Sequence, residues 1–183
     1  MAAVCPIGFD IEGLKNEVRR TYAAVAADPR GEFHFHRGPE YAARQLGYDA
    51  DELARLPRFA TEPFAGVGNP FKMGRLPAGA TVIDIGSGAG MDCLLAGSDV
   101  GPTGSVVGID MTEPMIAKAR ENAANGSYPN VEFRLGQIDA MPIAVRLLIK
   151  TQRRSSRCSR NGLIGPPSSS SCCCSFRRSA SGS

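Results

Sequence analysis

A glycine-rich turn near the middle of the chain has the residue types and spacing of a ligand-binding loop. It reads Asp84-Ile-Gly86-Ser87-Gly88-Ala-Gly90 and follows a β-branched apolar run that begins at Thr81. Glycine lets the backbone turn sharply and approach a ligand closely. After a parallel strand, such a turn faces the crevice at the carboxyl end of the sheet. The turn therefore predicts a cofactor site.

The spacing of the glycines distinguishes between two cofactors. A dinucleotide fingerprint would place its third glycine at position 91, where this chain has Met91. The tighter spacing, with Asp84 just ahead of it, fits S-adenosylmethionine better than NAD. An NAD-dependent oxidoreductase is therefore the disfavoured alternative.

Two further elements follow at the spacing that such a site needs. Asp110 lies 24 residues beyond Gly86, at the end of the next expected strand, where a carboxylate can accept hydrogen bonds from both ribose hydroxyls. The run Gly136-Gln137-Ile138-Asp139 follows a third strand. Taken alone, the turn is an ordinary strand–helix connection and Asp110 is a helix N-cap. The three elements together favour S-adenosylmethionine.

Strands and helices are expected to alternate around these residues. This order is typical of a parallel sheet built from right-handed crossover units. The sequence therefore predicts an α/β fold with a partial Rossmann-like parallel sheet, in a segment from 78 to 143. The expected elements are Thr81 to Ile85, Met91 to about Val100, Ser105 to Ile109, Glu113 to Ala124 and Val131 to Leu135.

The segment 1–77 is expected to form a helical lid or accessory layer. Apolar residues from Ile11 to Val25, including Tyr22, recur at spacings of three and four, which puts them on one helix face. Two shorter helices are expected, from Glu40 to Leu46 and from an N-cap at Asp49 to Leu56. A glycine-punctuated loop, 64–71, comes next. For Tyr22, contact with the cofactor and core packing remain equally open.

The segment 144–183 differs in composition from the rest. Residues 145–149 could add one more strand, but serine, arginine and cysteine dominate thereafter. Such a tail cannot bury enough apolar surface to offset its chain entropy, so we expect it to be disordered. It also carries the basic excess, which leaves the first 140 residues net acidic. Nothing there indicates a nucleic-acid partner.

Composition restricts the remaining function classes. No apolar segment has membrane-spanning length and no signal-peptide core follows Met1, so a cytoplasmic protein without a membrane partner is expected. The cysteines are isolated at Cys5, Cys93 and Cys158 and consecutive at 172–174, which indicates reduced thiols and no metal site. For His34 and His36, a solvent-facing or capping pair is favoured over a substrate or metal role. The sequence does not indicate an oligomeric state.

Three stretches resemble the arsenite methyltransferase family of class I S-adenosylmethionine-dependent methyltransferases. They are Gly86-Ser-Gly-Ala-Gly-Met-Asp-Cys93, Gly108-Ile-Asp-Met-Thr-Glu-Pro-Met115 and Gly66-Val-Gly-Asn-Pro-Phe71. The resemblance covers about residues 12 to 142. It implies methyl transfer from S-adenosylmethionine to trivalent arsenic or a related small acceptor. The implied cofactor-binding residues are Asp84, Gly86, Ser87, Gly88, Gly90, Asp110, Met111, Gln137, Ile138 and Asn69, with Gln137 and Ile138 where the family holds the adenine.

The resemblance breaks down where the family binds arsenic. Cysteine thiolates bind trivalent arsenic in that family, but this chain has Val67 in place of a loop cysteine, and the later cysteine-bearing region is missing. Cys93 is more typical of a small buried hydrophobic residue than of a ligand. No catalytic residue can be assigned. The acceptor implied is a small molecule, with an arsenite–thiol complex as the candidate.

The family's sheet should continue past Pro142, whereas the segment from Ala144 has the bias expected of GC-rich coding sequence read in a wrong frame. One hypothesis is therefore a product truncated or frame-shifted after about residue 143. The alternative function is a cofactor-binding but catalytically inactive remnant, a pseudoenzyme.

Overall fold

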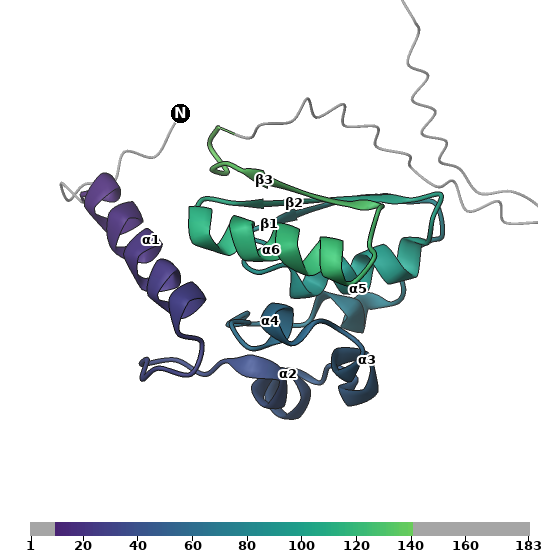
Figure 1. The fold of residues 1–183 in the computed structure, drawn as a ribbon, viewed down its shortest axis with the longest axis horizontal. Coiled ribbons are helices and arrows are strands. Elements are labelled where there is room, and N and C mark those ends of the chain that lie inside the picture. The colour runs from purple at the N-terminus through teal and green to yellow at the C-terminus, as the bar shows by residue number, and fades with distance from the viewer. Residues whose placement is uncertain (1–9, 141–183) are drawn as a thin grey trace, which may run out of the picture. The chain divides into compact units, whose positions relative to one another are not determined.

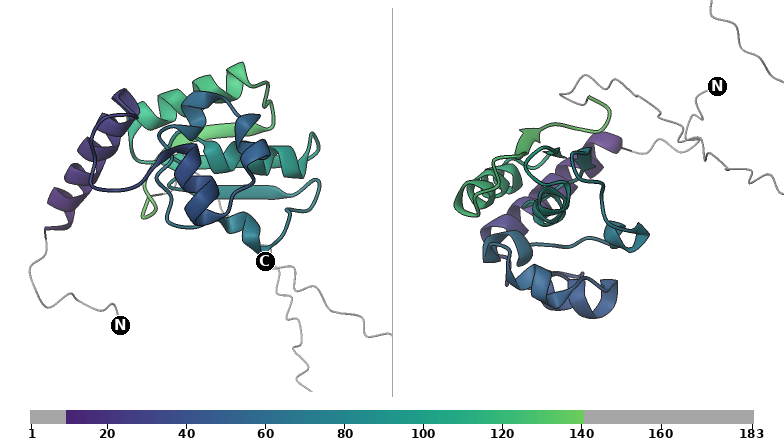
Figure 2. Two further views of the ribbon diagram at one scale, coloured as in Figure 1. Left: turned by 90° about the horizontal axis from the view of Figure 1, so that it is seen from below. Right: turned by 90° about the vertical axis from the view of Figure 1, so that its right-hand side faces the viewer.

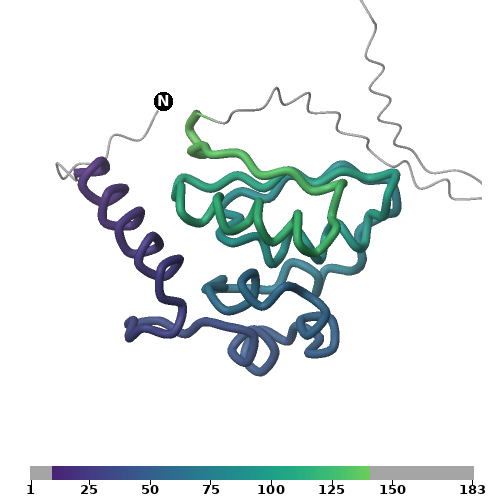
Figure 3. Tube along the Cα trace, viewed as in Figure 1, coloured from purple at the N-terminus to yellow at the C-terminus, as the bar shows by residue number. Residues whose placement is uncertain are grey.

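The computed structural model describes residues 10–140 of the 183-residue chain. All of them belong to one compact unit. The expected strand at 145–149, the expected disorder of 144–183 and the isolated Cys5 and Cys158 lie outside the described residues. Figure 3 follows the described chain from its first helix to the end of the last strand.

Three parallel strands form the sheet of the described region, in the order β1-β2-β3 (Figure 1). They are β1 (Thr81–Ile85), β2 (Ser105–Asp110) and β3 (Val131–Leu135). Gly108 of β2 is in register with Asp84 on one side and Phe133 on the other. The predicted partial Rossmann-like fold is confirmed. β2 is one residue longer than expected, because its pairing extends to Asp110.

Two helices connect the strands and pack on the same face of the sheet (Figures 1 and 2). They are α5 (Met91–Val100) and α6 (Glu113–Asn125). Side chains such as Leu94 of α5 and Phe133 of β3 are buried in one hydrophobic cluster. Complete burial of a leucine of this kind contributes about 1.5–3 kcal/mol. On the opposite face, Ile83 and Ile85 are 42% and 47% exposed among the described residues.

The helices before the sheet are more numerous than expected. They are α1 (Ile11–Ala27), α2 (Gly38–Leu46), α3 (Ala50–Ala54), α4 (Arg58–Thr61) and the 3-10 helix η1 (Pro70–Met73). Asp49 is the predicted N-cap of α3, where its carboxylate accepts from the amides of Asp51 and Glu52. The prediction that α3 reaches Leu56 was wrong, because the chain turns there and restarts as α4 behind Pro57. One-turn helices are too short to show a helical period.

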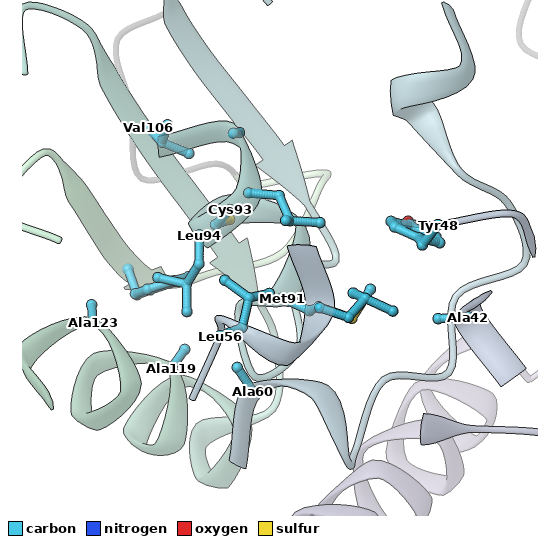
Figure 4. Close-up of a cluster of buried hydrophobic side chains, with 14 of the residues drawn as sticks. Ala42, Tyr48, Leu56, Ala60, Met91, Cys93, Leu94, Val106, Ala119 and Ala123 are labelled. Atoms are coloured by element: carbon cyan, nitrogen blue, oxygen red, sulfur yellow. The ribbon is translucent and has the colours of Figure 1, made fainter. Parts of the chain in front are cut away.

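One hydrophobic cluster joins the helices before the sheet to the α/β part (Figure 4). Leu56 and Ala60 pack there with Met91 and Leu94 of α5 and with Ala119 of α6. A smaller cluster fixes α1 beside α6, through Val25, Ala26, Ala89 and Met115.

The apolar face predicted for α1 is buried over only part of its length. Val25 is fully buried, whereas Ile11 and Leu14 are 57% and 50% exposed. The C-terminal end of α1 is therefore packed in the core, whereas its first turns are largely exposed. Over residues 10–140 the longest helix has 17 residues, and none is both long and apolar enough to cross a bilayer.

Candidate functional site

A pocket of about 480 Å³ opens at the carboxyl ends of the three strands. Small-molecule sites in proteins span about 300–1,000 Å³, and sheets of this kind bind ligands at this edge. The turn after β1 and the segments at the ends of β2 and β3 form one side of the pocket. Residues of α1, α4, the first turns of α5 and α6, and the loop before η1 complete its lining. Its charged lining residues are Lys15, Asp84, Asp92, Asp110 and Asp139.

The glycine-rich turn after β1 presents bare backbone to this pocket. Gly86 and Gly88 have φ angles of +83° and +54°, and a Cβ added to either would meet no atom within 4 Å. Side chains rarely adopt these angles, and here they would project into open space that a ligand can fill. The amides of Gly86 and Ser87 both donate to the Ile109 carbonyl, at 2.7 and 3.0 Å, which anchors the start of the turn to β2.

Asp110, at the end of β2, fixes the other half of the turn. Its Oδ2 accepts from the Gly88 amide at 3.0 Å, and its Oδ1 accepts from the Thr112 amide at 2.8 Å. Each carboxylate oxygen has a second lone pair, so both can still accept from a ligand. The residue that caps α6 is Thr112, so the carboxylate is not the helix cap itself.

Two further carboxylates lie in the pocket wall beside each other. Burial raises the pKa of Asp84, although a hydrogen bond from the Cys93 thiol partly offsets this effect. Burial also raises the pKa of Asp92 to about 6, the nearby charge of Asp84 adds to this rise, and a hydrogen bond from Tyr48 opposes it. None of the ion pairs within residues 10–140 involves Asp84, Asp92 or Asp110.

The lysine of the lining is already paired. Lys15 Nζ lies 2.8 Å from Asp139 Oδ2 and 3.3 Å from Glu12 Oε1. The contact with Asp139 raises the pKa of Lys15 and lowers that of Asp139. It also ties α1 to the segment after β3. The remaining lining charges are the three carboxylates Asp84, Asp92 and Asp110, so the pocket favours a cation.

Ser87 adds an unsatisfied hydroxyl to the pocket lining. Its Oγ is buried and has no hydrogen-bond partner within the described part of the chain. Buried polar atoms in proteins are nearly always paired, so an orphan beside an open pocket indicates a group that a ligand or water satisfies. The donors, acceptors and charges present fit S-adenosylmethionine, which carries a sulfonium, an ammonium, a carboxylate and two ribose hydroxyls.

The structure brings most of the predicted site residues to this one pocket. The lining residues among them are Asp84, Gly86, Ser87, Gly88, Asp110, Met111, Gln137 and Ile138.

Two predicted residues lie outside the lining. Gly90 is the N-cap of α5, and a Cβ there would come within 2.6 Å of the Phe133 ring, so its lack of a side chain serves packing. Asn69 caps η1 by accepting from the Phe71 amide, and its Nδ2 donates to the Gly47 carbonyl at 3.1 Å.

Sequence reasoning missed three polar residues at or beside the pocket, namely Lys15, Tyr48 and Asp92. Asp92 could have been found from its position in the first turn of α5, because that turn faces the same crevice. Lys15 and Tyr48 depend on how the N-terminal helices pack, which no local pattern shows.

The aromatic and histidine residues of the N-terminal part take simple roles. Tyr22 packs against Phe35, with ring centroids 6.0 Å apart, and it also lines the pocket, so contact with the cofactor stays a prediction. His34 and His36 are exposed, and His36 stacks on Tyr41. No group of three metal-ligating side chains occurs between residues 10 and 140.

No cysteine of the described region lines the pocket. Cys93 is fully buried, and its thiol donates to Asp84 Oδ2 at 3.2 Å. Burial raises the pKa of this thiol well above its ordinary value, so it is not a thiolate. Val67 does line the pocket, and its side chain is 96% exposed.

Comparison with known proteins gives several matches. Residues 76–147 match the family described as a methyltransferase domain. An arsenite methyltransferase of Halobacterium salinarum is 51% identical over 102 residues, 56% of this chain and 26% of the relative. One from Aquipseudomonas alcaligenes is 42% identical over 65 residues, 33% of this chain and 19% of the relative. The chain thus spans about a quarter and a fifth of these relatives.

Solved structures include an arsenic(III) S-adenosylmethionine methyltransferase from Chlamydomonas reinhardtii. It is 33% identical with a TM-score of 0.41, over 49% of this chain and 31% of that one.

Proposed function

Because residues 76–147 match a methyltransferase domain and the chain resembles class I S-adenosylmethionine-dependent arsenite methyltransferases, we propose the following function. The pocket at the carboxyl ends of β1, β2 and β3 binds S-adenosylmethionine. The protein transfers the methyl group to trivalent arsenic or a related small acceptor.

The charge of the pocket is the observation that carries this proposal. Asp84, Asp92 and Asp110 line it without ion-pair partners between residues 10 and 140, and the lining lysine is engaged by Asp139. A sulfonium and an ammonium are attracted by such a wall, whereas the pyrophosphate of NAD would be repelled. This agrees with the glycine spacing, which also disfavours NAD.

Each part of the cofactor has candidate residues. Asp110 would accept from the ribose hydroxyls, and the backbone of Gly86 and Gly88 would lie against the methionine part. The unpaired Ser87 hydroxyl would gain a partner. Gln137 and Ile138 would hold the adenine.

Bound S-adenosylmethionine supplies a methyl group on a positively charged sulfur. A lone pair of the acceptor forms the new bond to the methyl carbon as the carbon–sulfur bond breaks, and the electron pair of that bond stays on sulfur. With arsenic as acceptor, the positive charge passes from sulfur to arsenic, which is formally oxidised from the trivalent to the pentavalent state. The contribution of the chain is to orient the two reactants and exclude water. An arsenic lone pair needs no general base.

The acceptor proposed is trivalent arsenic carried by thiols from solution. The loop wall from Pro63 to Val67 brings apolar side chains and backbone to the pocket and no thiol. Glutathione-bound arsenite would bring its own sulfur ligands. The absence of a thiol from this loop wall also favours a second candidate function, cofactor binding without arsenic methylation.

Two measurements on the full chain test the proposal. Titration calorimetry with S-adenosylmethionine should show saturable binding to one site. Incubation with arsenite, glutathione and S-adenosylmethionine carrying a labelled methyl group should give labelled methylarsenic. Binding without labelled arsenic would support the second candidate, and absence of binding would refute both.

A further inference from the structure

Tyr48 carries a phenolic hydroxyl from the N-terminal helices to the pocket wall. The residue lies between α2 and α3, is 6% exposed, and packs edge-on against Phe64 and Phe71, with centroids 5.4 and 6.2 Å away. Figure 4 shows its ring within the hydrophobic cluster. Burial of a tyrosine ring usually requires a partner for its hydroxyl.

The hydroxyl has two acceptors within reach. It lies 2.8 Å from Asp92 Oδ1 and 3.2 Å from the Gly68 carbonyl. A phenol has one hydrogen to donate, and a charged acceptor at the shorter distance is the stronger one. The hydrogen therefore goes to Asp92 when that carboxylate is ionised. Oδ2 of Asp92 has no hydrogen-bond partner among residues 10–140.

We propose that Tyr48 is a positioning residue of the cofactor pocket, which acts through Asp92 by fixing the orientation and the ionised state of its carboxylate beside a bound cation. The inference rests on the proposed binding of S-adenosylmethionine. It adds Tyr48 to the residues proposed for cofactor binding, although Tyr48 lies outside the pocket lining and 44 positions from Asp92 in the sequence.

The electrostatic setting explains why Asp92 needs this partner. The carboxylate is buried and faces the like charge of Asp84 from β1, and both effects raise its pKa. The neighbouring Cys93 is a neutral thiol, and Lys15 from α1 is paired with Asp139. The Tyr48 hydroxyl is the one group that lowers the pKa of Asp92 among the causes of its shift. Its removal therefore raises that pKa further and leaves less carboxylate ionised near neutral pH.

The test compares Tyr48→Phe with Tyr41→Phe in the full chain. Each substitution removes a hydroxyl that reaches the loop backbone, since Tyr41 donates to the Gly66 carbonyl at 3.2 Å, but only Tyr48 also reaches Asp92. The readout is the Kd of S-adenosylmethionine by calorimetry from pH 5.5 to 8.5. One lost hydrogen bond corresponds to about a fivefold rise in Kd for Y48F near pH 7. As the pH is lowered, Y48F should begin to lose affinity at a higher pH than wild type does. For Y41F we expect the wild-type profile.

A double-mutant cycle with Asp92→Asn shows whether Tyr48 acts through Asp92. In the D92N background, Y48F should cause no further loss of affinity. An equal loss in both backgrounds, or a wild-type profile for Y48F, would overturn the inference. If Y48F does not fold, Asp92→Glu takes its place, because it keeps the charge but displaces the carboxylate from Tyr48. D92E should then bind more weakly than wild type although it keeps the charge, and wild-type affinity in D92E would overturn the inference.

These outcomes are separate from those of the proposed function. If wild type does not bind S-adenosylmethionine, the proposed function fails. If wild type binds and the cycle shows no coupling between Tyr48 and Asp92, only this inference fails.

Discussion

The Gly88 amide donates a hydrogen bond to Asp110 Oδ2 at 3.0 Å, which joins the glycine-rich turn after β1 to the end of β2. Two residues that sequence reasoning assigned separately to the cofactor are therefore parts of one structural unit. The carboxylate that would bind the ribose also shapes the loop that would receive the rest of the cofactor.

Because Asp110 both stabilises the turn and would bind the ribose, we expect Asp110→Ala to reduce the stability of the fold and the affinity for the cofactor together. The Gly88 and Thr112 amides both lose their acceptor, so the free energy of unfolding should fall by about 1–3 kcal/mol. The Kd of S-adenosylmethionine should rise at least about tenfold, because the ribose contacts are also lost. Chemical denaturation and calorimetry measure the two effects.

Asp99→Ala is the matched control for that variant. Its carboxylate also accepts from a backbone amide, that of Leu76, and from Arg75, but Asp99 is not a lining residue of the pocket. We expect a loss of stability with unchanged affinity. If D99A weakened the binding of S-adenosylmethionine as much as D110A does, the affinity loss in D110A would result from reduced stability and not from lost contacts with the cofactor.

Gly88→Ala should weaken cofactor binding more than it weakens the fold. The φ angle of +54° costs a non-glycine residue about 1–2 kcal/mol, and the added methyl group would project into the pocket. Gly47→Ala provides the comparison, since Gly47 has φ +69° at the end of α2, outside the pocket. Losses of stability are expected in both variants, since the flexible end of Lys72 must also move away from the new Cβ in G47A, with loss of S-adenosylmethionine affinity in G88A alone. Normal affinity of G88A would show that the turn does not contact the ligand.

Asp92 should give the protein a measurable pH dependence of stability. Its pKa is about 6 in the folded chain and near 3.8 when unfolded. A raised carboxyl pKa means that the charged form destabilises the fold above pH 6, and that stability is regained as the pH falls from about 6 to about 4. Asp92→Asn should therefore raise the free energy of unfolding by up to about 3 kcal/mol at pH 7.5, and hardly at all at pH 4. Denaturant melts at both values measure this, and a destabilised D92N at pH 7.5 would contradict it.

Cofactor affinity should change with pH in the opposite direction. Protonation of Asp92 removes a negative charge from the pocket, so binding of a cationic ligand should weaken as the pH falls through about 6. In D92N this step should be absent. As the pH falls, the free energy of unfolding should therefore rise while the affinity for the cofactor falls. This is expected of a charged residue that destabilises the fold but is needed for binding.

The core can be tested at Leu94, which is fully buried between α5 and the helices before the sheet. Leu94→Ala should cost about 2–5 kcal/mol, from lost transfer free energy and a residual cavity. Leu14, at 50% exposure on α1, is the control, and Leu14→Ala should lie within about 0.5 kcal/mol of wild type. Similar midpoints for the two variants in thermal unfolding would mean that the helical layer does not share a core with the sheet.

Local patterns explain which parts of the fold and of the site could be predicted from sequence. β1, α5 and β3 have the predicted bounds, because apolar periodicity and flanking glycines define them within a few residues. The positions of Asp110 and Gly88 could be predicted in the same way, because both residues lie directly at or after the ends of strands that these patterns define. The short α4 and η1 have no such period.

Contacts between distant segments account for the remainder. Tyr48 and Asp92 are 44 positions apart, and Lys15 and Asp139 are 124 apart, so neither pair could be deduced without the packing of the helices. For the same reason, the burial of α1 at Val25 but not at Leu14 could not be predicted from its spacing alone.

We propose that the acidic pocket of this chain selects S-adenosylmethionine. The most direct measurement is a calorimetric titration of the full chain with S-adenosylmethionine and, under the same conditions, with NADH. We predict saturable one-to-one binding of S-adenosylmethionine, loss of that binding in D110A, and no binding of NADH. Binding of NADH without binding of S-adenosylmethionine would contradict the account.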